Sequence, residues 1–166
     1  HALLGVGGAL ALLVAVLLIN TLARPSQQIE VQPLPPAEVD IPGLAGRLSG
    51  ALRAQTISSL EDPNLNADQF VLLHRHLARS FPRLHATLRR EVVNGLSLLY
   101  TWEGSDPKAA PILLMGHQDV VPISPGTERD WTHEPFAGAV EDGFVWGRGA
   151  WDNKSSIVAQ MEAIEM

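Results

Sequence analysis

The 166-residue sequence predicts an α/β fold in which helices flank a mixed sheet, preceded by one transmembrane helix. Three observations predict it. Apolar residues recur with helical spacing in three stretches after residue 42, and short strand-like runs bounded by turn residues lie between them. The apolar run Ile112–Met115, between Pro111 and Gly116, is typical of a strand covered on both faces. Residues 2–23 carry no charged side chain.

Residues 2–23 predict a membrane anchor or a signal segment. A spanning helix needs about 20 apolar residues, whereas a secretory signal has an apolar region of about 7–15 residues and a small-residue cleavage site. We favour an uncleaved, single-pass anchor that places the following residues on the extracytoplasmic side. A cleaved signal and secretion is the alternative. Residues 24–42 contain five prolines and predict an extended spacer.

Residues 43–166 predict the helices and strands of the α/β domain. Helices are expected over Gly43–Ala54, from Asn66 to about Ser80, and from about Asn153 onward. Asn66 is the candidate N-cap of the second helix, with Gln69 three residues later. Strands are expected over Leu84–Val93 and Leu96–Trp102, which the Asn94-Gly95 turn joins, and over a hairpin at Val140–Trp146 with its turn at Asp142-Gly143.

Three polar residues are candidates for a site. His117 and Asp119 follow the predicted strand 112–115, at the strand end where α/β proteins bind ligands, and they point to the same side of an extended chain. A metal-bound histidine usually donates its other N–H to a carboxylate, and His-x-Asp supplies both groups. Asp152 follows Gly147 and Gly149. Taken singly, these residues would be strand-end and helix-cap residues.

The motifs resemble those of a known enzyme family. Gly116-His117-Gln118-Asp119-Val120-Val121-Pro122, Trp131, Pro135-Phe136, Asp142-Gly143, Gly147-Arg148-Gly149-Ala150 and Asp152-Asn153-Lys154 carry the resemblance. The family is that of the co-catalytic zinc exopeptidases and amidohydrolases, which includes carboxypeptidase S, aminoacylase, acetylornithine deacetylase and succinyl-diaminopimelate desuccinylase. The Val-Val-Pro…Trp…Pro-Phe spacing and the apolar N-terminus are most similar to the carboxypeptidase S and N-fatty-acyl-amino-acid synthase/hydrolase branch.

The resemblance implies a role for each candidate residue. His117 would bind one zinc ion, Asp119 would act in catalysis by orienting His117, and Asp152 would bridge two zinc ions. The bond Asp152–Asn153 would be cis. The family's general base and remaining ligands, a Glu-Glu pair followed by an acidic residue and a late histidine, have no counterpart here, since Glu162 and Glu165 are separated by two residues. We therefore expect residues 43–166 to be the N-terminal part of a truncated catalytic domain, and the isolated chain to be inactive.

The implied activity is zinc-dependent hydrolysis of an amide bond beside a free carboxylate, in a peptide or an N-acyl amino acid. The implied partners are that substrate, the membrane through the N-terminal helix, and a second copy through a lid domain. The net charge of −6 and the lack of a broad basic face disfavour nucleic acid. Without cysteine, disulfides and thiolate zinc sites are excluded. Two alternatives remain: a membrane-tethered, non-catalytic binding protein of the same fold, and a deacetylase or desuccinylase of small metabolites.

Overall fold

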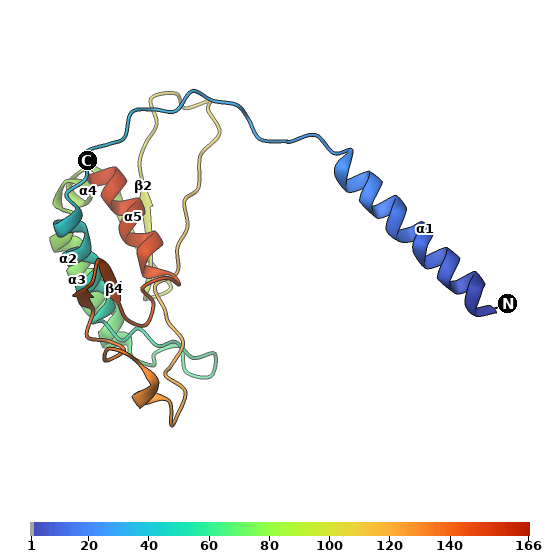
Figure 1. The fold of residues 1–166 in the computed structure, drawn as a ribbon. Helices are drawn as coiled ribbons and strands as arrows, with labels where there is room; N and C mark the ends of the chain where they lie inside the picture. The colour runs from blue at the N-terminus through green and yellow to red at the C-terminus, as the bar shows by residue number, and fades with distance from the viewer. Residues whose placement is uncertain (1) are drawn as a thin grey trace. The chain divides into compact units, whose positions relative to one another are not determined.

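The computed structural model describes residues 2–166, with side chains from Gly5 onward, and the chain divides into two compact units, His1–Ala37 and Glu38–Met166. The first unit holds one α-helix, α1, over Ala2–Leu22 (Figure 1). Within it, Gly5–Leu22 is long and apolar enough to cross a membrane, and a signal sequence fits the same description. Extended residues follow to the start of the second unit.

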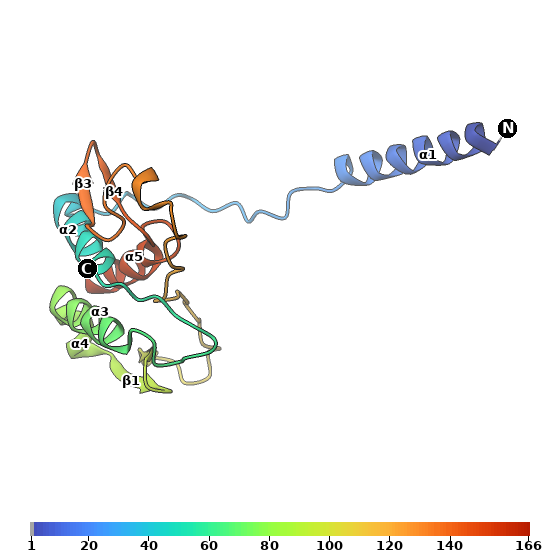
Figure 2. The same cartoon turned by 90° about the horizontal axis from the view of Figure 1, so that it is seen from below.

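Four α-helices build the second unit: α2 over Ile41–Leu52, α3 over Ala67–Ser80, α4 over Pro82–Thr87 and α5 over Lys154–Glu165. A short 3-10 helix, η1, covers Glu128–Asp130. Helix α2 begins where the side chain of Asp40 accepts a hydrogen bond from the backbone of Gly43 at 3.1 Å, which satisfies a free N–H group of the first turn. Helix α5 lies against α2 and α4. Figure 2 shows α5 beside α2.

The hydrophobic core lies between these four helices. Its buried side chains come from the ends of α2, the inner faces of α3, α4 and α5, and the connections between them: Ala51, Ala54, Leu73, Leu77, Phe81, Leu84, Leu88, Val158 and Met161. One ion pair also crosses the α2–α5 contact. Arg47 donates two hydrogen bonds to Glu162, at 2.7 and 2.5 Å, and Glu162 is 8% exposed. The pair fixes the end of α5 against α2.

Two antiparallel hairpins complete the unit. Strand β1 (Arg89–Val93) pairs with β2 (Ser97–Thr101), and β3 (Ala139–Glu141) pairs with β4 (Phe144–Trp146). At both turns the two central residues have positive φ, 49° and 88° at Asn94-Gly95 and 53° and 81° at Asp142-Gly143, as type I′ turns require. Both predicted hairpins are therefore confirmed, and so are the predicted helices over 43–54 and 67–80 and from residue 154.

The α/β class is confirmed, but the mixed sheet is not formed by residues 2–166. Their only sheets are the two hairpins, and the only parallel pairing is an isolated bridge between Ile57 and Val120. The prediction of a buried strand at 112–115 is also wrong, because these residues have no partner strand within the described part of the chain. Its residues are extended but lack a ladder partner, and their side chains are 61–89% exposed. A strand needs a neighbour to satisfy its backbone, and none of the described residues supplies one.

Two smaller predictions are also wrong. The first half of the predicted strand Leu84–Val93 belongs instead to helix α4. Pro82 at the start of α4 favours a helix. The carboxylate of Glu165 also caps α4, since it accepts hydrogen bonds from the backbone of Arg83 and Leu84 at 2.9 and 2.8 Å. Asn66 does precede α3, but its side chain caps nothing. It donates to the carbonyl of Ile57 instead, at 3.1 Å.

Candidate metal-binding site

His117 lies between two carboxylates. Its Nδ1 is 3.1 Å from Oδ1 of Asp119 and 3.0 Å from the carbonyl oxygen of the same residue, and its Nε2 is 2.8 Å from Oδ1 of Asp152. The structure thus brings together all three candidate residues, although 35 positions separate His117 from Asp152. Asp119 lies on one side of the imidazole ring and Asp152 on the other.

The segment that carries His117 is positioned by Thr56, which follows α2. The hydroxyl of Thr56 donates to the carbonyl of Gln118 at 2.6 Å, and the amide of Val120 donates to the carbonyl of Thr56 at 2.9 Å. Thr56 is completely buried. The side chain of Gln118 points elsewhere, since it accepts from His74 at 2.7 Å and donates to the carbonyl of Leu96 at 3.0 Å. These hydrogen bonds hold the His117 segment in place, although the preceding residues 112–115 do not pair with a strand among residues 2–166.

The segment that carries Asp152 is positioned by Gly149 and Lys154. Gly149 has φ +83°, and a Cβ atom there would lie 2.7 Å from a methyl group of Val120, so the turn passes close under the His117 segment. The amide of Lys154 donates to the carbonyl of Gly149 at 3.0 Å. The peptide bond Asp152–Asn153 is cis. Asp152 does not cap α5; its side chain is 79% exposed and turns toward His117.

Lys154 is a buried cation. It is 1% exposed, and its ammonium donates to the carbonyls of Ala51 and Ala54 at 3.0 and 2.6 Å. Ala51 lies in the last turn of α2 and Ala54 two residues beyond its end, where backbone oxygens lack the regular helical partners. Burial lowers the pKa of Lys154 to about 8, so the ammonium form persists at neutral pH. The contact joins the start of α5 to the end of α2, beside the Asp152 turn.

The two carboxylates favour the protonated form of His117. The hydrogen bond with Asp152 is the main cause that raises the pKa of His117, and partial burial opposes it. Both ring nitrogens can donate together only in the imidazolium. A metal ion that binds Nε2 has to displace this proton, so metal affinity falls as the solution becomes more acidic.

These groups fit part of a transition-metal site. A neutral imidazole nitrogen and a carboxylate oxygen are ligands that zinc accepts, and the exposed Nε2 and Asp152 carboxylate already face each other. Asp119 is engaged with the other ring nitrogen and is not a third ligand. Among residues 2–166 no three His, Asp or Glu side chains are grouped to hold a metal ion, and a catalytic zinc site takes about three protein ligands.

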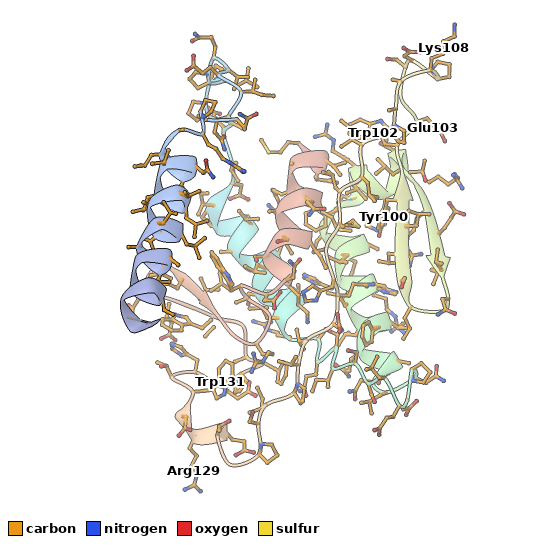
Figure 3. The ribbon with its side chains drawn as sticks, turned by 90° about the vertical axis from the view of Figure 1, so that its right-hand side faces the viewer. Tyr100, Trp102, Glu103, Lys108, Arg129 and Trp131 are labelled. Carbon is orange, nitrogen blue, oxygen red and sulfur yellow. The ribbon has the colours of Figure 1, made fainter. Side chains whose placement is uncertain are left out.

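The three residues line a pocket of about 210 Å³. One wall is formed by Trp131, from the loop after η1 (Figure 3), and by Arg148, whose guanidinium carbon lies 5.0 Å from the centre of the Trp131 ring. Val121 and Trp151 add apolar surface. The pocket therefore combines two carboxylates and an imidazole with a guanidinium and apolar side chains.

The other four histidines among residues 2–166 and the two late glutamates serve the fold. His76 bonds the carbonyl of Arg47 at 2.7 Å, and His85 bonds the hydroxyl of Tyr100 at 2.8 Å. Burial lowers the pKa of His74, which faces Gln118, and His133 packs on Trp146. Glu162 and Glu165 are committed to Arg47 and to the start of α4, so neither lies at the site.

Comparison with known proteins finds a family match around this site. The model of "Peptidase family M20/M25/M40" matches residues 113–166, which include all three candidate residues. This stretch of the chain is therefore similar to that family. Within the M20/M25/M40 match, His117 lies near the start and Asp152 lies two residues before α5.

Curated relatives extend the similarity beyond residues 113–166. Carboxypeptidase S of Saccharomyces cerevisiae is 46% identical over 126 residues, which are 72% of this chain and 22% of that protein. Probable carboxypeptidase S-like 2 of Dictyostelium discoideum is 37% identical over 157 residues, 90% of this chain and 30% of that protein. N-fatty-acyl-amino acid synthase/hydrolase PM20D1 of Mus musculus is 40% identical over 122 residues, 72% of this chain and 23% of that protein.

The chain thus spans 22–30% of the length of these curated relatives. Sequence reasoning missed three residues that shape the site. Ser58 contacts Asp119, Gln118 fastens the His117 segment, and Lys154 is buried under the Asp152 turn. Ser58 lies 61 positions from its partner and carries no motif signal. A lysine directly after Asp152-Asn153 carries no pattern that predicts burial.

Proposed function

We propose that the protein is a zinc-dependent hydrolase of amide bonds that lie beside a free carboxylate, acting on C-terminal peptide bonds or on N-acyl amino acids. The observation that carries the proposal is the approach of Nε2 of His117 to the carboxylate of Asp152, in a pocket within the M20 match. The names of the carboxypeptidase S and N-fatty-acyl-amino acid hydrolase relatives support this choice of substrate.

In this proposal His117 and Asp152 hold the metal, and Asp119 holds His117. Bound zinc ions of this kind lower the pKa of a bound water and polarise the scissile carbonyl. The hydrogen bond from Nδ1 of His117 to Asp119 fixes the tautomer that leaves Nε2 free for the metal. Trp131, Val121 and Arg148 line the same pocket. An apolar side chain or acyl group fits against this wall.

The test is a hydrolysis assay of the full-length protein. Its substrates are an N-acyl amino acid and a peptide, each compared with the same molecule after its free carboxylate has been converted to an amide. We expect hydrolysis of the carboxylates, at least tenfold slower hydrolysis of the amides, loss of activity with a zinc chelator, and recovery on adding zinc. A full-length protein that contains zinc and hydrolyses none of these substrates would contradict the proposal.

We further propose that α1 anchors the protein in a membrane with the site on the extracytoplasmic side. All its side chains from Gly5 to Leu22 are exposed in the structure, and the span is 18 residues of mean hydropathy 2.2. Deleting residues 1–23 should move the protein from the carbonate-resistant membrane fraction to the soluble fraction. The control deletes residues 26–37 of the spacer and should stay membrane-bound. Wild-type protein that is soluble and still carries α1 would contradict the anchor.

A further inference from the structure

We propose that Ser58 is a positioning residue of this site, which acts on the metal ligand His117 through Asp119. The hydroxyl of Ser58 donates to Oδ2 of Asp119 at 2.5 Å, and Oδ1 of the same carboxylate accepts from Nδ1 of His117 at 3.1 Å. Nε2 of His117 then meets Asp152 at 2.8 Å. Four side chains thus form one chain of hydrogen bonds from Ser58 to the proposed ligands. The inference rests on the proposed metal site.

The backbone explains why Ser58 lies opposite Asp119. Ile57 and Val120 form a parallel bridge, and the amide of Val120 donates to the carbonyl of Thr56. Residues 56–58 therefore run beside residues 118–120. This is the only strand-like partner of the His117 segment among residues 2–166. The buried Thr56 holds the backbone, and the exposed Ser58 is left free to bind a side chain.

Asp119 needs such a partner because its own surroundings do not fix it. Its side chain is 43% exposed, so its rotamer is not determined by packing. With Oδ2 held by Ser58, the carboxylate presents Oδ1 to His117. A carboxylate that is fixed in this way holds the imidazole tautomer and orientation that metal binding needs. Without the hydroxyl, the Asp119 side chain is free to rotate toward solvent.

The test compares metal affinity in five variants of the full-length protein, by competition for Zn²⁺ with a chromophoric chelator. Removing a hydrogen-bonded partner of a metal-bound histidine typically costs about 10–100-fold in metal affinity. Ser58 acts one residue further away and is exposed, so we expect Ser58→Ala to weaken affinity about 3–10-fold. Ser58→Thr, which keeps the hydroxyl, should restore most of it. Ser59→Ala is the matched control, since the Ser59 hydroxyl accepts only from the nearby backbone of Glu61 and Asp62; its affinity should equal that of wild type.

The last two variants, Asp119→Ala and the Ser58→Ala/Asp119→Ala double variant, test whether Ser58 acts through Asp119. If Ser58 acts through Asp119, Ser58→Ala should add no further loss in a protein that already carries Asp119→Ala. Equal affinity of Ser58→Ala and wild type, or losses that add fully in the double variant, would overturn the inference. Failure of the wild-type protein to bind Zn²⁺ at all would instead overturn the proposed metal site, so the two failures are distinguishable.

Discussion

Replacing His117 by alanine in the full-length protein should lower amide hydrolysis about 1000-fold or more, because bound metal supplies several kcal/mol of the catalysis and each 1.4 kcal/mol is about tenfold in rate. The variant should also lose its bound zinc. His117 and Asp152 have side chains that are 48% and 79% exposed, so neither is needed for the core. The thermal unfolding midpoint of the metal-free variant should therefore equal that of metal-free wild type.

The measurement is the zinc content of the purified protein together with kcat/KM. Asp152→Asn should behave like His117→Ala, since the amide keeps the shape of the side chain and loses the charge that binds the metal. His133→Ala is the control: it lies on the loop after η1, packs on Trp146 and does not line the pocket. Activity and zinc content above half of the wild-type values in His117→Ala would contradict the assignment of His117 as a ligand.

Replacing Lys154 by methionine should lower the free energy of unfolding by about 3 kcal/mol. Each carbonyl keeps a backbone donor, the amide of Ala54 or of Thr56, but loses a hydrogen bond from a charged group, and such bonds contribute about 1.5–3 kcal/mol each. Methionine keeps the apolar stem, so the loss is not caused by a cavity. Because Lys154 also sets the turn that carries Asp152, metal affinity should fall with stability.

Urea denaturation of the full-length protein in detergent measures this change. The matched control is Lys108→Met, the same substitution at the other lysine of the chain. Figure 3 shows Lys108 at the far end of the loop that follows β2, and such surface changes usually stay within about 0.5 kcal/mol. Unfolding midpoints that are equal in Lys154→Met and Lys108→Met would contradict the role of the buried ammonium.

Local patterns predicted the local parts of this structure. The type I′ turns at Asn94-Gly95 and Asp142-Gly143 each depend on two adjacent residues with positive φ. Helix α3 could be predicted because its apolar residues recur with the period of one helix face. The same holds for the site, since His117, Asp119 and the Asp152 turn form motifs short enough to recognise. Their roles as ligands stay predictions, as does the division of residues 2–166 into anchor, spacer and domain.

The parts that depend on distant residues could not be predicted. The run Ile112–Met115 has the composition of a buried strand, but composition does not say which segment pairs with it, and here none of the described residues does. Burial of Lys154 arises from the end of α2, about 100 positions away. The contact of Ser58 with Asp119 arises from the parallel bridge at Ile57. Each of these three features depends on a contact between distant residues, which the local pattern of apolar and polar residues does not reveal.

The most direct test of the metal site is anomalous diffraction at the zinc absorption edge from crystals of the full-length protein. The account predicts an anomalous peak between Nε2 of His117 and the carboxylate of Asp152, with the hydrogen bond between these groups replaced by metal ligation and Asp119 still bound to Nδ1. Zinc bound elsewhere, with His117 and Asp152 still in direct contact, would contradict it.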